Sequence, residues 1–66
     1  MNEEIYKDGI INAIKILDDE VQLLRAKRNR EPGERVKESY NSQILSHILS
    51  IQHLRETIND GTEEED

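Results

Sequence analysis

Apolar residues in the first half of the chain repeat with the spacing of an α-helix. They recur at alternating steps of four and three positions, as Ile10, Ile14, Leu17, Val21 and Leu24. This heptad-like spacing places all five on one stripe of a helix. Residues 3–30 contain no proline, and Asn2 can cap the first turn. We therefore expect a helix over residues 2–30, in which Gly9 costs about 1 kcal/mol relative to alanine.

A second helix is predicted by the same spacing after the single proline. Pro32 lacks a backbone N–H and disfavours helical angles at the preceding residue, so the first helix should end near Arg30. Pro32 itself should lie in the first turn of the next helix. Asn59 and Gly61 are typical stop signals, which gives a second helix over residues 32–60. Its stripe consists of Tyr40, Ile44, His47, Ile51, Leu54 and Ile58.

The short connection at residues 31–33 predicts an all-α, two-helix antiparallel hairpin, because short helix-helix connections join antiparallel neighbours. The hairpin forms one domain over residues 1–60. The segment TEEED that follows Gly61 has no apolar residue and carries like charges. Residues 61–66 are therefore expected to form a disordered acidic tail.

Each helix also carries apolar residues that its first stripe does not use. They project more than ~100° away from that stripe on a helix that turns ~100° per residue. A two-helix hairpin can bury only one face of each arm. We therefore expect a homo-oligomer, most simply a two-fold dimer that forms a four-helix bundle, although a helix of an unrelated partner would satisfy the same residues. These interface candidates are Ile5, Ile16 and Leu23 in the first helix and Leu45 and Leu49 in the second.

The length and composition of the chain favour the same interpretation. A chain of 66 residues buries little apolar surface, and without cysteine it has no disulfide to stabilise a small core. The absence of cysteine is also typical of a reducing cytoplasm.

The N-terminus MNEEIYKDG has neither the basic nor the apolar region of a signal peptide, and no apolar run approaches ~18 residues. We expect a cytoplasmic protein that does not enter a membrane.

Charge changes sign twice along this acidic chain of net charge −6. Residues 1–24 and 38–66 are acidic, whereas residues 25–37, the predicted hairpin tip, are basic. One interpretation is that each tip neutralises the acidic termini of another copy in the oligomer. The other is that the tip binds an anion or a partner protein, with Tyr6 or Tyr40 as a stacking surface. The candidate residues are Arg25, Lys27, Arg28, Arg30, Arg35 and Lys37.

No motif for catalysis or metal binding is apparent. His47 and His53 are six positions apart, which turns them ~120° from one another on a helix and does not suit a metal pair. We expect His47 to line the contact between the helices and hydrogen-bond across it, and His53 to lie on the surface. The acidic run Asp18–Glu20 points in several directions and is interpreted as a solvated face. The sequence predicts no catalytic residue, no metal and no cofactor.

The string SQILSHIL, residues 42–49, resembles the SQELD signature of small two-helix aspartyl-phosphate phosphatases. Ile44 stands where that family has Glu, and Ser46 where it has its functional Asp, so no activity is transferred. In architecture alone, an acidic dimerising hairpin is similar to Rop-type RNA-binding bundles and to phage oligomers that sequester cyclic nucleotides.

The amino-acid sequence alone leaves three functions open. The leading hypothesis is a small non-enzymatic interaction protein of the phage or bacterial regulator type, which modulates or inhibits a larger protein. The alternative is an oligomer that sequesters a small phosphorylated or cyclic nucleotide ligand through its basic tip. The third is a Rop-like nucleic-acid binder, which is disfavoured because no aromatic residue lies among the tip arginines to stack on bases.

Overall fold

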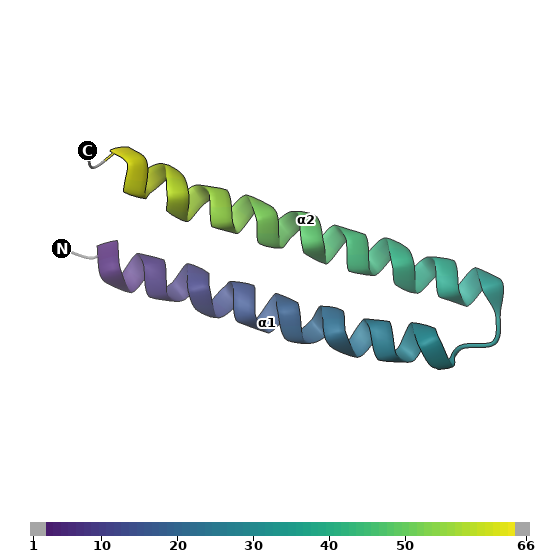
Figure 1. Ribbon diagram of the computed structural model, residues 1–66. Helices are drawn as coiled ribbons and strands as arrows, with labels where there is room; N and C mark the ends of the chain where they lie inside the picture. Colours follow the sequence, from purple (N-terminus) through teal and green to yellow (C-terminus); the bar gives the residue numbers. More distant parts are fainter. Residues whose placement is uncertain (1–2, 65–66) are drawn as a thin grey trace.

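The computed structural model describes residues 3–64 as two α-helices that run antiparallel, side by side (Figure 1). Helix α1 spans Glu3–Arg30 and helix α2 spans Glu34–Glu64. The connection between them, residues 31–33, forms one end of the hairpin, and the start of α1 lies with the end of α2 at the other (Figure 1). The predicted all-α hairpin is confirmed.

The core of the hairpin lies along the two predicted stripes, which face each other. Val21 and Leu24 of α1 are only 2% and 4% exposed, and they form one cluster with Ile44 and Ile51 of α2. Ile10 is also buried. The alternating spacing of four and three therefore identified the faces through which the helices pack. Partly buried side chains extend the cluster at its edges: Ile14, Leu17, Tyr40 and Ile48.

The connection between the helices is fixed by three hydrogen bonds. The Glu31 N–H donates to the Arg28 carbonyl at 3.1 Å, and the Lys37 N–H donates to the Gly33 carbonyl at 3.0 Å. The Glu31 carboxylate also accepts from the Gly33 N–H at 3.2 Å. Because the Gly33 carbonyl accepts the first bond of α2, Gly33 is the N-cap. Pro32 thus precedes the cap, and its predicted place in the first turn of α2 is corrected.

The other end of α2 also differs from the sequence-based boundary. Helix α2 continues through Asn59 and Gly61 to Glu64. The expected end at residue 60 is therefore too early, and residues 61–64 of the predicted acidic tail are helical in this structure. A glycine ends a helix only where the chain leaves helical angles, and a helix can continue through it at a cost of about 1 kcal/mol. Residues 65 and 66 lie outside the described part of the chain.

The hairpin is a thin rod rather than a globule. Its dimensions are 50 × 16 × 11 Å, and its radius of gyration is 15.3 Å. A compact chain of this length would have a radius of gyration of about 11 Å. In a rod of two helices, each helix keeps one long side that no other part of the described chain covers. Neither helix, within residues 3–64, is apolar over a stretch long enough to cross a membrane.

Candidate functional site

The five interface candidates lie on the uncovered sides of the helices. Their exposed fractions range from 49% for Leu23 to 70% for Ile5. Leu45 and Leu49 are 57% and 55% exposed on α2, and Ile16 is 59% exposed on α1. The hairpin thus buries one apolar stripe of each helix and leaves the second apolar line of each helix exposed to water. Large aliphatic side chains exposed in this way favour association.

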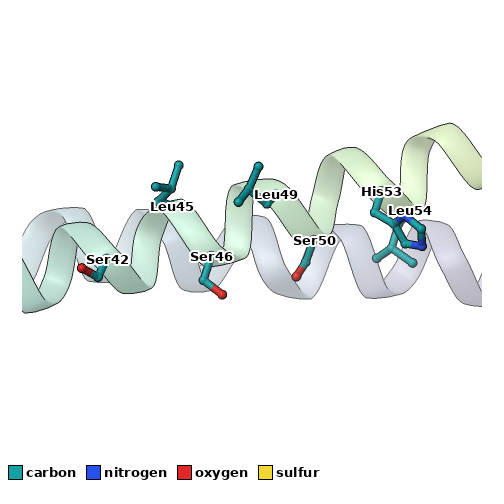
Figure 2. Close-up of a pocket in the computed structure, with 7 residues that line it drawn as sticks. All are labelled: Ser42, Leu45, Ser46, Leu49, Ser50, His53 and Leu54. Atoms are coloured by element: carbon teal, nitrogen blue, oxygen red, sulfur yellow. The ribbon is translucent and has the colours of Figure 1, made fainter.

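The exposed side of α2 is hollowed into an open groove. Figure 2 shows Leu45 and Leu49 projecting side by side from the helix, one turn apart. Small serine side chains recur every four residues beside them, which places them on neighbouring turns of the same side. Because the serines are short and the leucines long, the surface between them is concave. We call this surface the α2 groove; its lining residues are Ser42, Leu45, Ser46, Leu49, Ser50, His53 and Leu54.

The α2 groove lies in the longest part of the chain without formal charge. Residues 39–54 contain no Asp, Glu, Lys or Arg, although such residues make up 36% of the chain. The exposed side of α1, in contrast, carries Asp19 and Glu20 between Ile16 and Leu23. Removing ionised side chains from water is costly, so the α2 groove is the easier of the two surfaces to bury. The groove serines are not among the site residues predicted from the sequence, although the uncharged run and the four-residue spacing of the serines indicate this surface.

The basic tip is only partly available to a ligand. The Arg28 guanidinium donates to the Asn41 side-chain oxygen at 2.9 Å, which ties α1 to α2, and to that of Asn29 at 3.3 Å. The Lys37 ammonium lies 4.0 Å from the Glu34 carboxylate. Two of the six predicted tip cations are therefore engaged within the hairpin. The other four are exposed: Arg25, Lys27, Arg30 and Arg35.

Within one chain, the exposed tyrosine lies away from these cations, and the other tyrosine is half-buried. Tyr40 is half-buried and packs against the core. Tyr6 is 62% exposed, but it lies in the first turns of α1, at the opposite end of the hairpin from the tip. Its separation from Arg28 along the helix is about 33 Å at 1.5 Å per residue. One chain alone therefore does not bring Tyr6 to the tip.

The histidines occupy the expected positions, with one correction. His47 is half-buried, and His53 is exposed and lines the α2 groove. The expected hydrogen bond of His47 across the helix contact is not formed among the residues that the structure describes. No group of three or more His, Cys, Asp or Glu side chains in the described part of the chain could hold a metal ion.

Comparison with known proteins finds no match: no family model, no curated protein and no solved structure matches this chain. The features of the chain that bear on its function are therefore the α2 groove, the exposed apolar line of α1 and the basic tip.

Proposed function

We propose that this chain is a small non-enzymatic interaction protein of the cytoplasm. Hairpins self-associate, most simply as a dimer that forms a four-helix bundle. The apolar side chains that the dimer leaves uncovered bind a larger protein and modulate or inhibit it. The observation that carries this proposal is the amount of surface, much of it apolar, that the single hairpin exposes.

The exposed area of the hairpin exceeds what a compact protein of its size exposes. Its accessible surface is 5282 Å² for a mass of 7.7 kDa. Compact monomers of this mass expose about 4300 Å². The excess, about 1000 Å², is close to the ~800 Å² that each partner buries in a standard protein-protein interface. Pairing of two hairpins would bring the exposed area per chain back to the ordinary value.

Self-association is tested by measuring the mass of the wild-type protein by sedimentation equilibrium at micromolar concentration. We expect the mass of two chains or of a small multiple, because removal of the exposed aliphatic side chains from water lowers the free energy of the assembly. A folded, helical species that sediments with the mass of one chain across this concentration range would contradict the proposal.

Two substitutions separate an interface from a merely exposed surface. Leu49 and Ile11 are both 55% exposed, but only Leu49 belongs to the predicted interface. Leu49→Glu should raise the dissociation constant of the dimer by about 100-fold or more, because an unpaired carboxylate would enter the interface. Ile11→Glu should leave the dissociation constant nearly unchanged. Equal effects of the two substitutions on the sedimentation profile would show that Leu49 is not in the interface.

The exposed cations of the basic tip favour a second candidate function. Arg25, Arg30 and Arg35 could bind a phosphorylated small molecule, and an oligomer would sequester it. A thermal-shift screen with mononucleotides and cyclic dinucleotides tests this function. A ligand at 100 times its dissociation constant would stabilise the fold by about 2.7 kcal/mol. A shift with these ligands would favour sequestration, a shift with RNA alone would favour a Rop-like function, and no shift would favour the protein-binding function.

A further inference from the structure

We propose that the α2 groove binds the α2 groove of a second copy, with the two α2 helices antiparallel and in one defined register. This inference rests on the proposed function, because it concerns the surface through which hairpins self-associate. It deepens that function by naming the helix, the orientation and the residues that meet. Because this face of α2 lies opposite α1, the dimer is a row of four helices with the two α2 helices at its centre, in place of a closed four-helix bundle.

The groove is part of a longer line of positions along α2. From residue 35 to residue 60 these positions alternate by steps of four and three, the spacing of a coiled-coil contact. At ~100° per residue the line lies on the side of α2 opposite Ile44 and Ile51, which pack against α1. Every side chain from Arg35 to Glu56 on this line is exposed. We call it the contact line; it comprises Arg35, Ser39, Ser42, Ser46, Leu49, His53, Glu56 and Asp60.

The sizes of the side chains on the contact line favour an antiparallel pair. Its first half holds three serines, and its second half holds larger side chains. If the two-fold axis passes between Ser46 and Leu49, Ser46 lies opposite Leu49 of the partner subunit. Ser42 then lies opposite His53 of the partner subunit, so a small side chain meets a large one in both of these layers. A parallel pair would instead place serine against serine and leucine against leucine, which leaves voids between the helices.

The charges at the two ends of the contact line select the same orientation. Arg35 is at the first end, and Glu56 and Asp60 are at the other. The antiparallel register places Arg35 opposite the position of Asp60 of the partner subunit and one layer from that of Glu56. A parallel pair would bring Arg35 next to Arg35 and Glu56 next to Glu56. Opposite charges at both ends therefore favour the antiparallel pair, and like charges disfavour the parallel one.

The uncharged part of α2 fits the centre of this interface. Residues 39–54 hold no Asp, Glu, Lys or Arg, and the midpoint of the contact line falls inside this stretch. The layers around the two-fold axis are thus formed by serine, leucine and histidine. Their burial removes no formal charge from water, whereas the charged residues remain at the rim, where water screens them.

Cysteine cross-linking tests the orientation directly, because the natural chain has no cysteine. The double variant Ser39→Cys/Glu56→Cys places two thiols that the antiparallel register brings together in one layer. Within a chain these positions are about 25 Å apart along α2, too far for a disulfide. Both side chains are exposed in the hairpin, so the substitutions should not disturb its fold. Circular dichroism of the reduced variant checks this.

In a glutathione redox buffer, the double variant should form a covalent dimer on a non-reducing gel. Each single variant, Ser39→Cys or Glu56→Cys, should remain a single chain, because its two thiols lie at opposite ends of the interface. Dimers of either single variant would show a parallel pair and overturn the proposal. A wild type that sediments as a dimer while no variant cross-links would overturn it and leave self-association standing. A monomeric wild type would overturn both.

Discussion

At the scale of single residues, the hairpin depends on very few buried side chains. Val21, Leu24, Ile44 and Ile51 form the cluster that joins the helices, and no side chain in the described part of the chain is less than 2% exposed. A small core contributes only a few kcal/mol of net stability. One truncation in this cluster should therefore remove a large fraction of the free energy of unfolding.

Leu24→Ala tests this dependence. We expect a loss of about 2–4 kcal/mol in the free energy of unfolding, from the lost transfer free energy and the cavity that remains. Ile11→Ala is the matched control on the same helix, since Ile11 is 55% exposed, and it should change stability by less than about 0.5 kcal/mol. Urea unfolding followed by circular dichroism measures both. Equal losses would mean that the core is not where the structure places it.

The Arg28–Asn41 hydrogen bond is a second feature at this scale, because it joins the helices by side chains beside the connection. Asn41→Ala should cost about 1 kcal/mol of unfolding free energy, the ordinary net value of such a bond. Arg28→Ala should cost a similar amount, and the double variant should cost little more than either one. Strict additivity in this double-mutant cycle would show that the two side chains do not interact in solution.

At the scale of the helices, two glycines show the effects of backbone propensity and capping. Gly9 lies inside α1, and a Cβ added there would meet nothing within 4 Å. Gly33 is the N-cap of α2, where a Cβ would lie 3.3 Å from the Glu31 carboxylate. Neither has a positive φ, so neither glycine is required by its backbone angles.

The two glycines should respond differently to alanine. Gly9→Ala should raise the free energy of unfolding by about 1 kcal/mol, because alanine loses less backbone entropy in a helix interior. Gly33→Ala should give no such gain, because alanine is a poor N-cap and its methyl group would displace the Glu31 carboxylate. Thermal unfolding of both variants measures the difference. A larger gain at Gly33 than at Gly9 would contradict the capping role of Gly33.

The sequence predicted the helices themselves better than their ends. The regular apolar spacing around Val21 and Ile44 depends on helix geometry alone, so it identified both helices and their contact faces. The start of α2 depends on which carbonyl accepts the first hydrogen bond, and that is decided by the Glu31 carboxylate folding back onto Gly33. Such a local contact leaves no periodic signal. The end of α2 was missed for a related reason, since Gly61 permits a helix end without requiring one.

At the scale of the whole molecule, the order of charges along the chain becomes a spatial arrangement. The basic tip occupies one end of the rod, and the acidic ends of the helices occupy the other. The sequence foresaw this arrangement and the exposed leucines of α2. It did not foresee that Arg28 is engaged with Asn41, because that contact depends on how the two helices are aligned. The distance of Tyr6 from the tip, in contrast, follows from the length of α1 alone.

Charge reversal at the tip tests the assembly. In the antiparallel dimer, Arg35→Glu places like charges together at both ends of the interface. It should therefore raise the dissociation constant of the dimer several-fold at low salt. The effect should shrink as salt screens the charges, since the Debye length is about 10 Å at 0.1 M. Lys15→Glu changes the net charge equally on the exposed side of α1 and is the control. Sedimentation at several salt concentrations should separate the two variants, and identical behaviour would remove the electrostatic argument for the orientation.

The position of the chain ends has a consequence for covalent fusion. The start of α1 and the end of α2 lie together at one end of a rod 50 Å long (Figure 1). In an antiparallel dimer the ends of one copy are therefore separated from those of the other by nearly the length of the rod. A tandem gene that joins two copies would need a linker of about 15 extended residues to reach that distance. A shorter linker would prevent the two halves from pairing with each other and would direct each to a neighbouring molecule, which turns a closed dimer into an open polymer.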